Sequence, residues 1–233
     1  MELGQYYQCF VNYRVEPKEL SSWIPQGLEI ELFEGRPVVS WVFATVQPSK
    51  IWGLRWPSKE WVYSLSLRTY VRNKIGNQHQ RGFFNLTGYL STSWSVRALS
   101  WLGFGTMQRL FMDRSVHFEP HEKSSRGVFQ YQWRLKETED WKVLKLRTLG
   151  VPEPAMAGYL EYFTTERELQ FLSSDKLKSG IVHQHEPWYL WEIDELTLPQ
   201  KWPGTLFNQF NTQKPLSAFV VKGSKVQLKK IKF

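Results

Sequence analysis

The sequence has very little cysteine: Cys9 is the only one among 233 residues. A single thiol excludes an internal disulfide, and it excludes the zinc clusters and iron–sulfur sites that need several cysteine ligands. Its rarity suits a reducing compartment. The first residues also lack the basic and apolar regions of a signal peptide. We therefore predict a cytoplasmic protein, in which the Asn85-Leu86-Thr87 glycosylation sequon has no meaning.

Long apolar segments and familiar catalytic motifs are missing as well. No uncharged apolar run is long enough to span a membrane. The nucleophile elbow, the P-loop and the dinucleotide-binding fingerprint are all absent. Internal repeats, low-complexity tracts and an obvious interdomain linker are absent too. The sequence therefore predicts a single domain over residues 1–233, without a membrane span.

Acidic residues are outnumbered, with 22 Asp and Glu against 30 Lys and Arg, for a formal charge of +8. Such an excess is compatible with nucleic acid, an anionic membrane surface or an acidic ligand. The basic residues are scattered, and no known nucleic-acid-binding motif accompanies them, so we predict no nucleic acid partner. The densest group is Lys222, Lys225, Lys229, Lys230 and Lys232. Polar and apolar residues alternate there, which indicates a strand whose solvated lysine face discourages edge-to-edge pairing.

Alternation of polar and apolar residues is the dominant pattern of the chain. The predicted strands are Tyr7–Val15, Glu29–Phe33, Val38–Val46, Val62–Arg72, Gly82–Tyr89, Arg114–Phe118, Gly127–Leu135, Lys142–Leu149, Arg167–Leu172, Gly180–Glu192, Ser217–Lys222 and Lys225–Ile231. Helices are predicted at Ser91–Leu102, which Gly103 would end, and at Ala155–Phe163. Many strands with few helices favour an antiparallel barrel or sandwich. The 12 tryptophans suit a wide barrel interior or an apolar pocket.

The stretch from Val11 to Gln47 reads as strand, short helix, strand, tight turn and long strand. Pro17 favours a first helical turn, Pro25 ends that helix, and Glu34-Gly35 supplies a turn that tolerates positive φ. The motifs are Tyr13-Arg14-Val15-Glu16-Pro17-Lys18-Glu19-Leu20, Ile24-Pro25-Gln26-Gly27-Leu28-Glu29 and Phe33-Glu34-Gly35-Arg36-Pro37. This pattern resembles the opening of the YqjF-like family of domains of unknown function, within the acetoacetate-decarboxylase-like superfamily.

Further motifs continue the resemblance in the same order along the chain. They are Leu67-Arg68-Thr69-Tyr70-Val71, Phe163-Thr164-Thr165-Glu166-Arg167 and Ile181-Val182-His183-Gln184-His185-Glu186-Pro187-Trp188. The resemblance implies a mainly β fold, a large and partly closed antiparallel β-barrel with short peripheral helices and a central cavity. The acetoacetate decarboxylases of this superfamily use a buried lysine as a Schiff-base nucleophile.

The sequence departs from the decarboxylases where that lysine is expected. No lysine occurs between Lys74 and Lys123, and Lys123 lies in a polar turn where desolvation would be weak. The glutamate usual shortly before the Arg-Thr-Tyr-Val strand is also missing, since Tyr63-Ser64-Leu65-Ser66 stands there. These departures predict that the protein performs no lysine-dependent decarboxylation.

Arg68, Tyr70, Glu166 and His185 are the candidate ligand-binding residues. Arg68 and Tyr70 lie two residues apart on one strand face, where the arginine could clamp a carboxylate or phosphate and the tyrosine could donate a hydrogen bond. The equally favoured alternative is that Arg68 forms an ion pair with an acid such as Glu166. In Glu166-Arg167 the two side chains point to opposite faces, so either could reach the cavity.

His183 and His185 are also spaced by two on a predicted strand. Such a pair binds zinc or copper when a third ligand, here His117 or Glu166, lies close. Because this spacing is common by chance, we predict neither a metal nor another cofactor. A second hypothesis makes His185 a general acid or base beside Glu166 or Glu186. The ordinary alternative is that these histidines pair across strands or hydrogen-bond a carbonyl.

The Trp-rich segment Trp52–Trp61 mixes indoles with basic residues. It would suit stacking on bases, contact with a membrane surface, a pocket lid or, as we prefer, a core that covers the barrel mouth. Three functions therefore stay open. The leading one is binding of a small anionic organic molecule in a barrel cavity; the others are a lyase or hydratase acting on a keto or other carboxylic acid, and a binding protein for an acidic surface. A homo-oligomer is compatible with all three.

Overall fold

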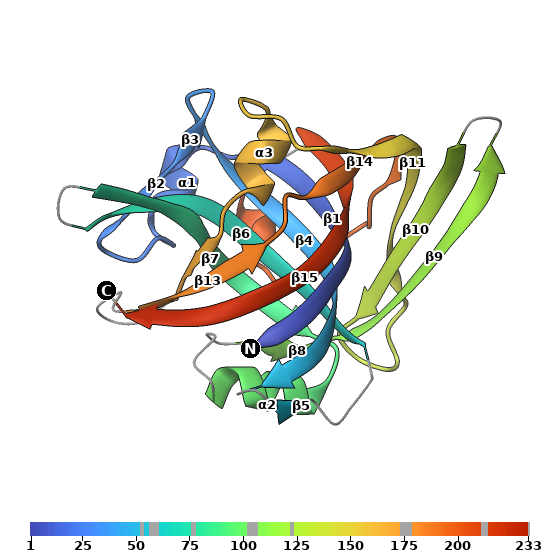
Figure 1. Cartoon of the computed structure of the whole chain (residues 1–233), viewed down its shortest axis with the longest axis horizontal. Helices are drawn as coiled ribbons and strands as arrows, with labels where there is room; N and C mark the ends of the chain where they lie inside the picture. Colours follow the sequence, from blue (N-terminus) through green and yellow to red (C-terminus); the bar gives the residue numbers. More distant parts are fainter. Residues whose placement is uncertain are drawn as a thin grey trace.

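Figure 1 shows the computed structural model of the chain, in which residues 1–51, 54–55, 61–75, 78–101, 107–121, 124–172, 179–210 and 214–232 are described. The helices are α1 (Pro17–Ser21), α2 (Ser93–Trp101) and α3 (Leu160–Thr165), with a short 3-10 helix η1 (Phe207–Gln209). The strands are β1 (Glu2–Arg14), β2 (Leu28–Ile30), β3 (Leu32–Phe33), β4 (Arg36–Ile51), β5 (Leu54–Arg55), β6 (Val62–Ile75), β7 (Gln78–Leu90), β8 (Gln108–Arg109), β9 (Phe111–His121), β10 (Ser124–Arg134), β11 (Lys142–Pro154), β12 (Leu169–Phe171), β13 (Ser179–His185), β14 (Tyr189–Thr197) and β15 (Ser217–Lys232).

Seven of these strands close into a barrel, which confirms the predicted architecture. Their order is β1-β4-β6-β7-β12-β13-β15, and pairing of β1 with β15 completes the ring. All neighbouring pairs are antiparallel except β7 and β12, which run parallel. Parallel neighbours need a long crossover, and the chain between β7 and β12 supplies one because it first builds α2, the strands β8 to β11 and α3. The barrel is thus almost wholly antiparallel, as expected, with one parallel pair; outside the ring, the short strand β8 also runs parallel to β7.

A second group of strands leaves the barrel at β15. The sheet continues from β15 through β14, β11 and β10 to β9, and these strands extend to one side of the barrel in Figure 1. β15 holds both parts together, since Leu190–Glu192 of β14 pairs with its first half and β13 pairs with its second half. Gly223 separates the two halves at φ +90, and a side chain there would collide with the backbone of Gln5. The expected break between Lys222 and Lys225 is therefore a turn within one continuous strand.

The main apolar core lies outside the barrel lumen, between the wall formed by β1, β4 and β6 and the strands β10 and β11. It includes Cys9, Val11, Trp41, Phe43, Leu65, Leu67, Phe129, Tyr131, Trp133, Leu144 and Leu146, all nearly inaccessible to solvent. Trp202 closes this core by stacking between Trp41 and Trp133, with ring centroids 4.9 and 5.3 Å away. Burial of this apolar area is the chief stabilising contribution to the fold.

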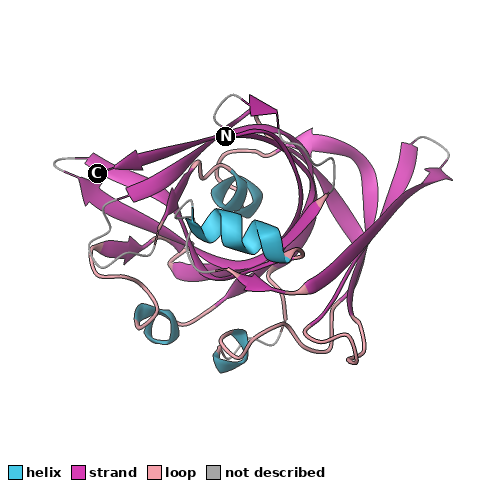
Figure 2. Cartoon of the chain, turned by 90° about the horizontal axis from the view of Figure 1, so that it is seen from below, coloured by secondary structure: helices cyan, strands magenta, loops and turns pink. Residues whose placement is uncertain are grey.

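Helices close the two ends of the barrel. α2 lies across one end, as the view from below shows (Figure 2), and Thr92 caps it by accepting a hydrogen bond from the Ser95 N–H at 3.4 Å. α3 covers the other end, where Phe163 packs on Tyr70 with ring centroids 5.0 Å apart. None of the helices in the described residues is long and apolar enough to cross a membrane. The expected end of α2 at Gly103 lies outside the described residues.

The local elements follow from the turn residues of the sequence. Pro17 stands in the first turn of α1, and the Glu19 carboxylate accepts a hydrogen bond from the Glu16 N–H at 3.1 Å, as in a capping box. Glu34 and Gly35 have φ values of 49° and 77°, so they form the two-residue turn that joins β3 to β4. The predicted helix start at Pro17 and the turn at Glu34-Gly35 are confirmed. The prediction that Pro25 ends this helix is wrong, since α1 already ends at Ser21.

Most predicted elements differ by a few residues at their ends, and Glu29–Phe33 is divided into β2 and β3. Two further differences have a clear backbone cause. The helix expected at Ala155–Phe163 begins only at Leu160, because Gly158 has a φ of +92° that no helix contains. The strand expected at Gly180–Glu192 is divided into β13 and β14 by Glu186-Pro187-Trp188. Pro187 cannot donate to a strand ladder, and at this point the chain passes from the barrel to the outer strands.

Candidate functional site

A cavity of about 180 Å³ lies in the lumen of the barrel. All seven barrel strands line it, and α2 and the segment that follows α3 complete its walls. The volume is far larger than one bound water needs. Most lining residues are apolar or neutral, and the charged side chains among the described residues of the lining are Arg68 and Arg167. The lining contains no Asp, Glu or Lys in the described part of the chain, so its fixed charge is positive.

Bulges in two of the strands decide which polar side chains face the lumen. Tyr7 has a φ of +50° and lies at a bulge of β1 against β4. Because of this extra residue, Gln5 and Gln8 both line the cavity although regular alternation would place them on opposite faces. The Tyr131 hydroxyl stabilises the bulge by donating to the Tyr7 carbonyl at 2.6 Å. The Gln8 side-chain nitrogen is buried without a hydrogen-bond partner in the described structure.

A second bulge occurs where β7 pairs with β6. Leu67 pairs with Thr87 and Arg68 with Asn85, so Leu86 is the extra residue. The bulge lets both Asn85 and Gly88 line the cavity. The Asn85 side-chain oxygen is buried without a partner in the described structure. Unpaired amide groups on a cavity wall are costly unless water or a ligand satisfies them, and bulges beside binding sites commonly re-aim such groups.

Arg68 lies in the cavity wall, where the sequence placed it. Its side chain is 9% exposed and donates from Nη2 to the Thr164 carbonyl of α3 at 2.8 Å. The guanidinium also lies over the rings of Phe10 and Phe83, at 4.5 and 4.8 Å from their centroids. It has no ion pair with any carboxylate in the described residues. The expected alternative of a pair with Glu166 is therefore not what the structure contains.

Tyr70 lies behind Arg68 and is not part of the cavity lining. Its hydroxyl is fully buried, 2.7 Å from the Ser40 hydroxyl and 3.4 Å from Arg68 Nε. Ser40 donates in turn to Asn12 at 2.5 Å. The shared strand face predicted from the spacing is therefore correct, but Tyr70 holds Arg68 in position instead of reaching a ligand.

Glu166 and Arg167 point in different directions, as predicted, and the arginine is the one that lines the cavity. Arg167 donates from Nη2 to the Glu31 carboxylate at 3.0 Å, and both side chains are more than nine-tenths buried. Arg81 reaches the same carboxylate at 3.2 Å. Burial lowers the pKa of Arg167, and the charge of Glu31 partly offsets that effect. Glu166 is not among the lining residues.

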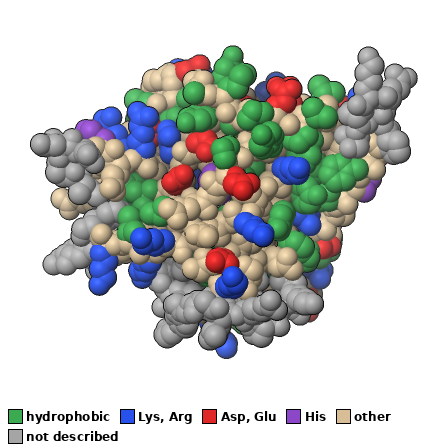
Figure 3. Space-filling view, viewed as in Figure 1, with side chains coloured by type: hydrophobic (Ala, Val, Ile, Leu, Met, Phe, Trp, Pro, Cys, Tyr) green, Lys and Arg blue, Asp and Glu red, His purple; other side chains and the backbone are tan. Residues whose placement is uncertain are grey.

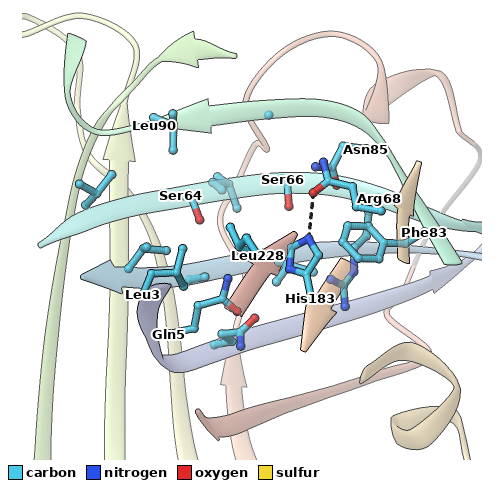
Figure 4. A pocket seen from close by; sticks show the side chains of 18 of the residues that line it. Leu3, Gln5, Ser64, Ser66, Arg68, Phe83, Asn85, Leu90, His183 and Leu228 are labelled. Atoms are coloured by element: carbon cyan, nitrogen blue, oxygen red, sulfur yellow. Dashed lines mark hydrogen bonds between the residues drawn. The ribbon is translucent and has the colours of Figure 1, made fainter. Parts of the chain in front are cut away.

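His183 lies in the cavity beside Arg68 (Figure 4). Burial lowers its pKa to about 3, with smaller contributions from Arg68 and His185, so the ring is neutral near pH 7. Nε2 lies 3.1 Å from the Gln170 side-chain oxygen, drawn as a dashed line in Figure 4. An amide oxygen only accepts, so Nε2 carries the proton and Nδ1 keeps a free lone pair.

His185 lines the cavity too, but both of its ring nitrogens are engaged by the protein. Trp188 donates its indole N–H to Nε2 at 2.6 Å, and Nδ1 donates to the Glu186 carbonyl at 2.8 Å. A ring held in this way has neither a free lone pair nor a free proton for a ligand. The arrangement matches the carbonyl-bonded alternative considered for this histidine more closely than an acid or base.

The residues considered as metal ligands do not come together. His117 lies on β9 and forms a 3.5 Å contact with Glu119 at the surface, away from the lumen-facing pair His183 and His185. No group of three or more His, Cys, Asp or Glu side chains that could hold a metal is found in the described residues. Cys9 is completely buried in the outer core, and burial raises the pKa of its thiol.

The Trp-rich segment is described only in part. Trp61 is 40% exposed and packs edge-on against Tyr6 with centroids 5.8 Å apart, so it is not buried core as we preferred. Trp52 and Trp56 lie outside the described residues, as does Lys123. On the face drawn in Figure 3, many Lys and Arg side chains gather toward the left edge, while Asp, Glu and hydrophobic side chains lie mainly across the middle and top. That face carries no uniformly basic surface.

Sequence reasoning missed several cavity residues. Gln8, Asn85 and Gln170 lie on the cavity wall, and Arg167 has Glu31 as its partner from a distant part of the chain. The position of Gln8 depends on a bulge that no local pattern announces, and the Glu31–Arg167 pair spans 136 positions. Arg167 itself was considered in the sequence as a residue that could reach the cavity, and only its pairing with Glu31 was missed.

Comparisons with known proteins agree with the fold. A family model described as an uncharacterized conserved protein, DUF2071, matches residues 7–224. The enduracididine biosynthesis enzyme MppR, solved with the condensation product of pyruvate and imidazole 4-carboxaldehyde, superposes with a TM-score of 0.65 at 11% identity, covering 99% of this chain and 88% of that one. Acetoacetate decarboxylase from Legionella pneumophila gives 0.61 at 13% identity, with 100% and 86% covered. An acetoacetate-decarboxylase-like enzyme from Sphingomonas wittichii RW1 gives 0.55 at 14% identity, with 99% and 92% covered. No curated protein matches the sequence.

Proposed function

The chain belongs to the DUF2071 family, which is the YqjF-like family its motifs resemble, and we propose that it binds a small organic anion in the barrel cavity without forming a covalent bond through lysine. The observation that carries this proposal is Arg68. Its guanidinium is buried on the cavity wall and forms no ion pair with a carboxylate in the described residues. A buried charge without a counter-charge is costly, and an anionic ligand would supply the missing charge.

Arg68 is a better anion site than Arg167. The charge of Arg167 is already compensated by Glu31 at 3.0 Å, whereas Arg68 donates to a neutral carbonyl and lies over aromatic rings. A guanidinium fixed in this way presents its remaining N–H groups in a rigid plane that suits a carboxylate. Arg167 would add a weaker, second positive charge to the same end of the cavity.

Lysine chemistry has no support in the cavity. Its described lining contains no lysine, so a lysine amine that could form a Schiff base is missing from the described walls. The lyase or hydratase hypothesis needs a proton carrier as well. Neither predicted proton carrier is available to a ligand in the cavity. His185 is hydrogen-bonded at both ring nitrogens, and Glu166 is outside the lining. Binding is therefore the function that the geometry supports best.

The proposal is tested by thermal-shift measurements and calorimetric titration with pyruvate, acetoacetate, butyrate and benzoate. A ligand that binds the native state raises the melting temperature. We expect Arg68→Met to weaken binding by about 30-fold or more, because truncating one partner of a buried charge pair costs roughly 2 kcal/mol or more. The matched control is Arg72→Met on the same strand, since Arg72 is exposed and pairs with Glu29 at 2.8 Å.

Two results would contradict the proposal. Equal binding by the wild type and Arg68→Met would show that the anion does not use this guanidinium. A covalent adduct trapped by borohydride in the presence of pyruvate or acetoacetate would show that a lysine reaches the ligand. We expect no change in mass from that treatment.

A further inference from the structure

The cavity has two chemically different ends. Figure 4 shows Arg68, Asn85, Phe83 and His183 gathered at one end, with Leu3 and Leu90 toward the other. We infer that the ligand is a monocarboxylic acid with an apolar chain or ring, bound with its carboxylate at Arg68 and its apolar part toward α2. This inference rests on the proposed function and names the chemical class that the whole cavity selects.

The charged end accommodates one negative charge. Arg68 is the guanidinium without a carboxylate partner in the described lining, and Arg167 is paired with Glu31. His183 is neutral near pH 7, since its pKa is lowered to about 3. A phosphate dianion or a dicarboxylate would bring a second charge, for which this end offers only Arg167 in the described lining, a guanidinium already paired with Glu31. A single carboxylate is the group whose charge this end balances.

The opposite end has no charged side chain in the described lining. Val46 and Val62 are paired neighbours on β4 and β6, and Leu3, Leu90 and Trp94 complete this part of the lining. The Met1 ammonium group in the lining already donates to the Leu228 carbonyl at 3.0 Å. An apolar part of the ligand gains free energy by leaving water for such a surface. A second ionised group would lose its hydration there and would find no charged side chain in the described lining.

Neutral polar groups occupy the length between the two ends. Ser64 and Ser66 line the cavity from β6, between Val62 and Arg68. The six steps from Val62 to Arg68 span about 20 Å at the ordinary strand rise, so the apolar part of the ligand can extend over several carbon atoms. The unpaired amide groups of Gln8 and Asn85 would bond water or an oxygen substituent carried near the carboxylate.

The test is calorimetric titration of the full chain with acetate, butyrate, hexanoate and octanoate at pH 7. We expect affinity to rise by about fourfold for each added methylene until the cavity is filled. Adipate has the same number of carbon atoms as hexanoate and a second carboxylate, and hexanol lacks the charge. Both should bind more than about tenfold more weakly than hexanoate. Affinities that do not increase with chain length, or adipate binding as tightly as hexanoate, would overturn the inference.

A variant that narrows the middle of the cavity gives an independent test. Ala44 lines the cavity and pairs with Ser64 across the strands, so Ala44→Phe should weaken the binding of hexanoate and octanoate far more than that of acetate and remove the gain with chain length. Ser64→Leu fills the same region from the neighbouring strand and should act in the same direction. Val151→Phe, at a position 62% exposed, is the control and should leave the whole series unchanged. Full retention of the chain-length gain in both cavity variants would contradict the inference.

The outcomes separate this inference from the proposed function. If short acids bind, and Arg68→Met abolishes their binding, while chain length has no effect, the proposed function stands and the inference fails. If no acid of any length binds, or binding is independent of Arg68, the proposed function itself fails. Binding that increases with chain length and is lost in Arg68→Met supports both.

Discussion

The two faces of the wall formed by β1, β4 and β6 differ sharply. The outer face is a closely packed apolar core, with Trp41, Phe43 and Leu67 at most 1% exposed. The inner face of the same strands presents Gln8, Ser64, Ser66 and Arg68 to a cavity. Because the outer strands supply the main packing, the lumen does not have to be filled to stabilise the fold. The comparison indicates that stability and binding are assigned to opposite faces of one set of strands.

The largest effect should come from the outer face. Trp41→Ala removes an indole that stacks on Trp202 at 4.9 Å and is 1% exposed, so we expect the free energy of unfolding to fall by about 3–5 kcal/mol. Urea denaturation measures it. Trp61→Ala, at an indole 40% exposed, should cost less than about 1 kcal/mol. Equal losses at both positions would contradict the assignment of stability to the outer core.

Lowering the pH should destabilise the protein through His183, which lies on the inner face of the barrel. Its pKa is about 3 in the folded chain against an ordinary value of 6.5, so protonation favours the unfolded chain. The contribution of neutral His183 to the free energy of unfolding is complete above pH 6.5 and is lost as the pH falls toward 3. Between pH 7 and pH 5 this residue should remove about 2 kcal/mol from the free energy of unfolding.

The variant His183→Gln isolates that contribution, because glutamine keeps a donor for Gln170 and does not titrate. Urea denaturation at pH 7 and pH 5 should show a loss for the wild type that is about 2 kcal/mol larger than the loss for the variant. Identical losses in the two proteins would show that His183 is not held neutral by the fold.

A smaller effect, of opposite sign, is expected at Arg68. Arg68→Met replaces an unpaired buried charge with an apolar side chain of similar length, so the unliganded protein should become more stable by about 1–2 kcal/mol. Urea denaturation without ligand tests this. A variant that loses both ligand binding and more than about 2 kcal/mol of stability would make Arg68 part of the packing, and the contrast between the two faces would not hold there.

The smallest change in stability is expected at the bulge of β1, where Tyr131 of the outer core contacts the barrel wall. Tyr131→Phe removes the hydroxyl that donates to the Tyr7 carbonyl at 2.6 Å, and we expect a loss of about 1 kcal/mol. Since this bond supports the bulge that turns Gln8 inward, affinity for hexanoate should also fall. Tyr13→Phe is a matched control in the same core, on a strand face away from the lumen, and it should leave hexanoate affinity unchanged. A larger loss of hexanoate affinity in Tyr13→Phe than in Tyr131→Phe would show that the bulge at Tyr7 does not support the binding site.

Much of the wall could be predicted from alternation alone. The sequence assigned Arg68 and Tyr70 to one face of a strand, and the structure confirms that they share a face of β6, on which Ser64 and Ser66 also lie. The motifs also predicted the barrel. Gln8 was not predictable, because a bulge at Tyr7 reverses the alternation of β1. A one-residue insertion changes the face of every side chain beyond it and leaves no reliable pattern in the sequence.

The candidate site was predicted only in part for a similar reason. Arg68 lies on the cavity wall, but Tyr70 supports it from behind, His185 is bonded at both nitrogens, and Glu166 is outside the lining. Arg167, next to Glu166, and His183, two residues before His185, line the cavity instead. Spacing identified segments that line the cavity, and side-chain contacts from other strands decided which residue of each segment is available to a ligand.

The sequence by itself determined the β architecture, the turns at Pro17 and Glu34-Gly35, and the lack of a lysine near the middle strands, because these depend on local backbone preferences and on composition. The tertiary structure decided which face of the wall became the lumen, which arginine kept an uncompensated charge, and which histidine kept a free nitrogen. Those outcomes depend on partners far away in the chain, such as Glu31 for Arg167 and Trp188 for the ring of His185. Burial and pairing are properties of the assembled barrel, so they emerge only when the strands have closed around the cavity.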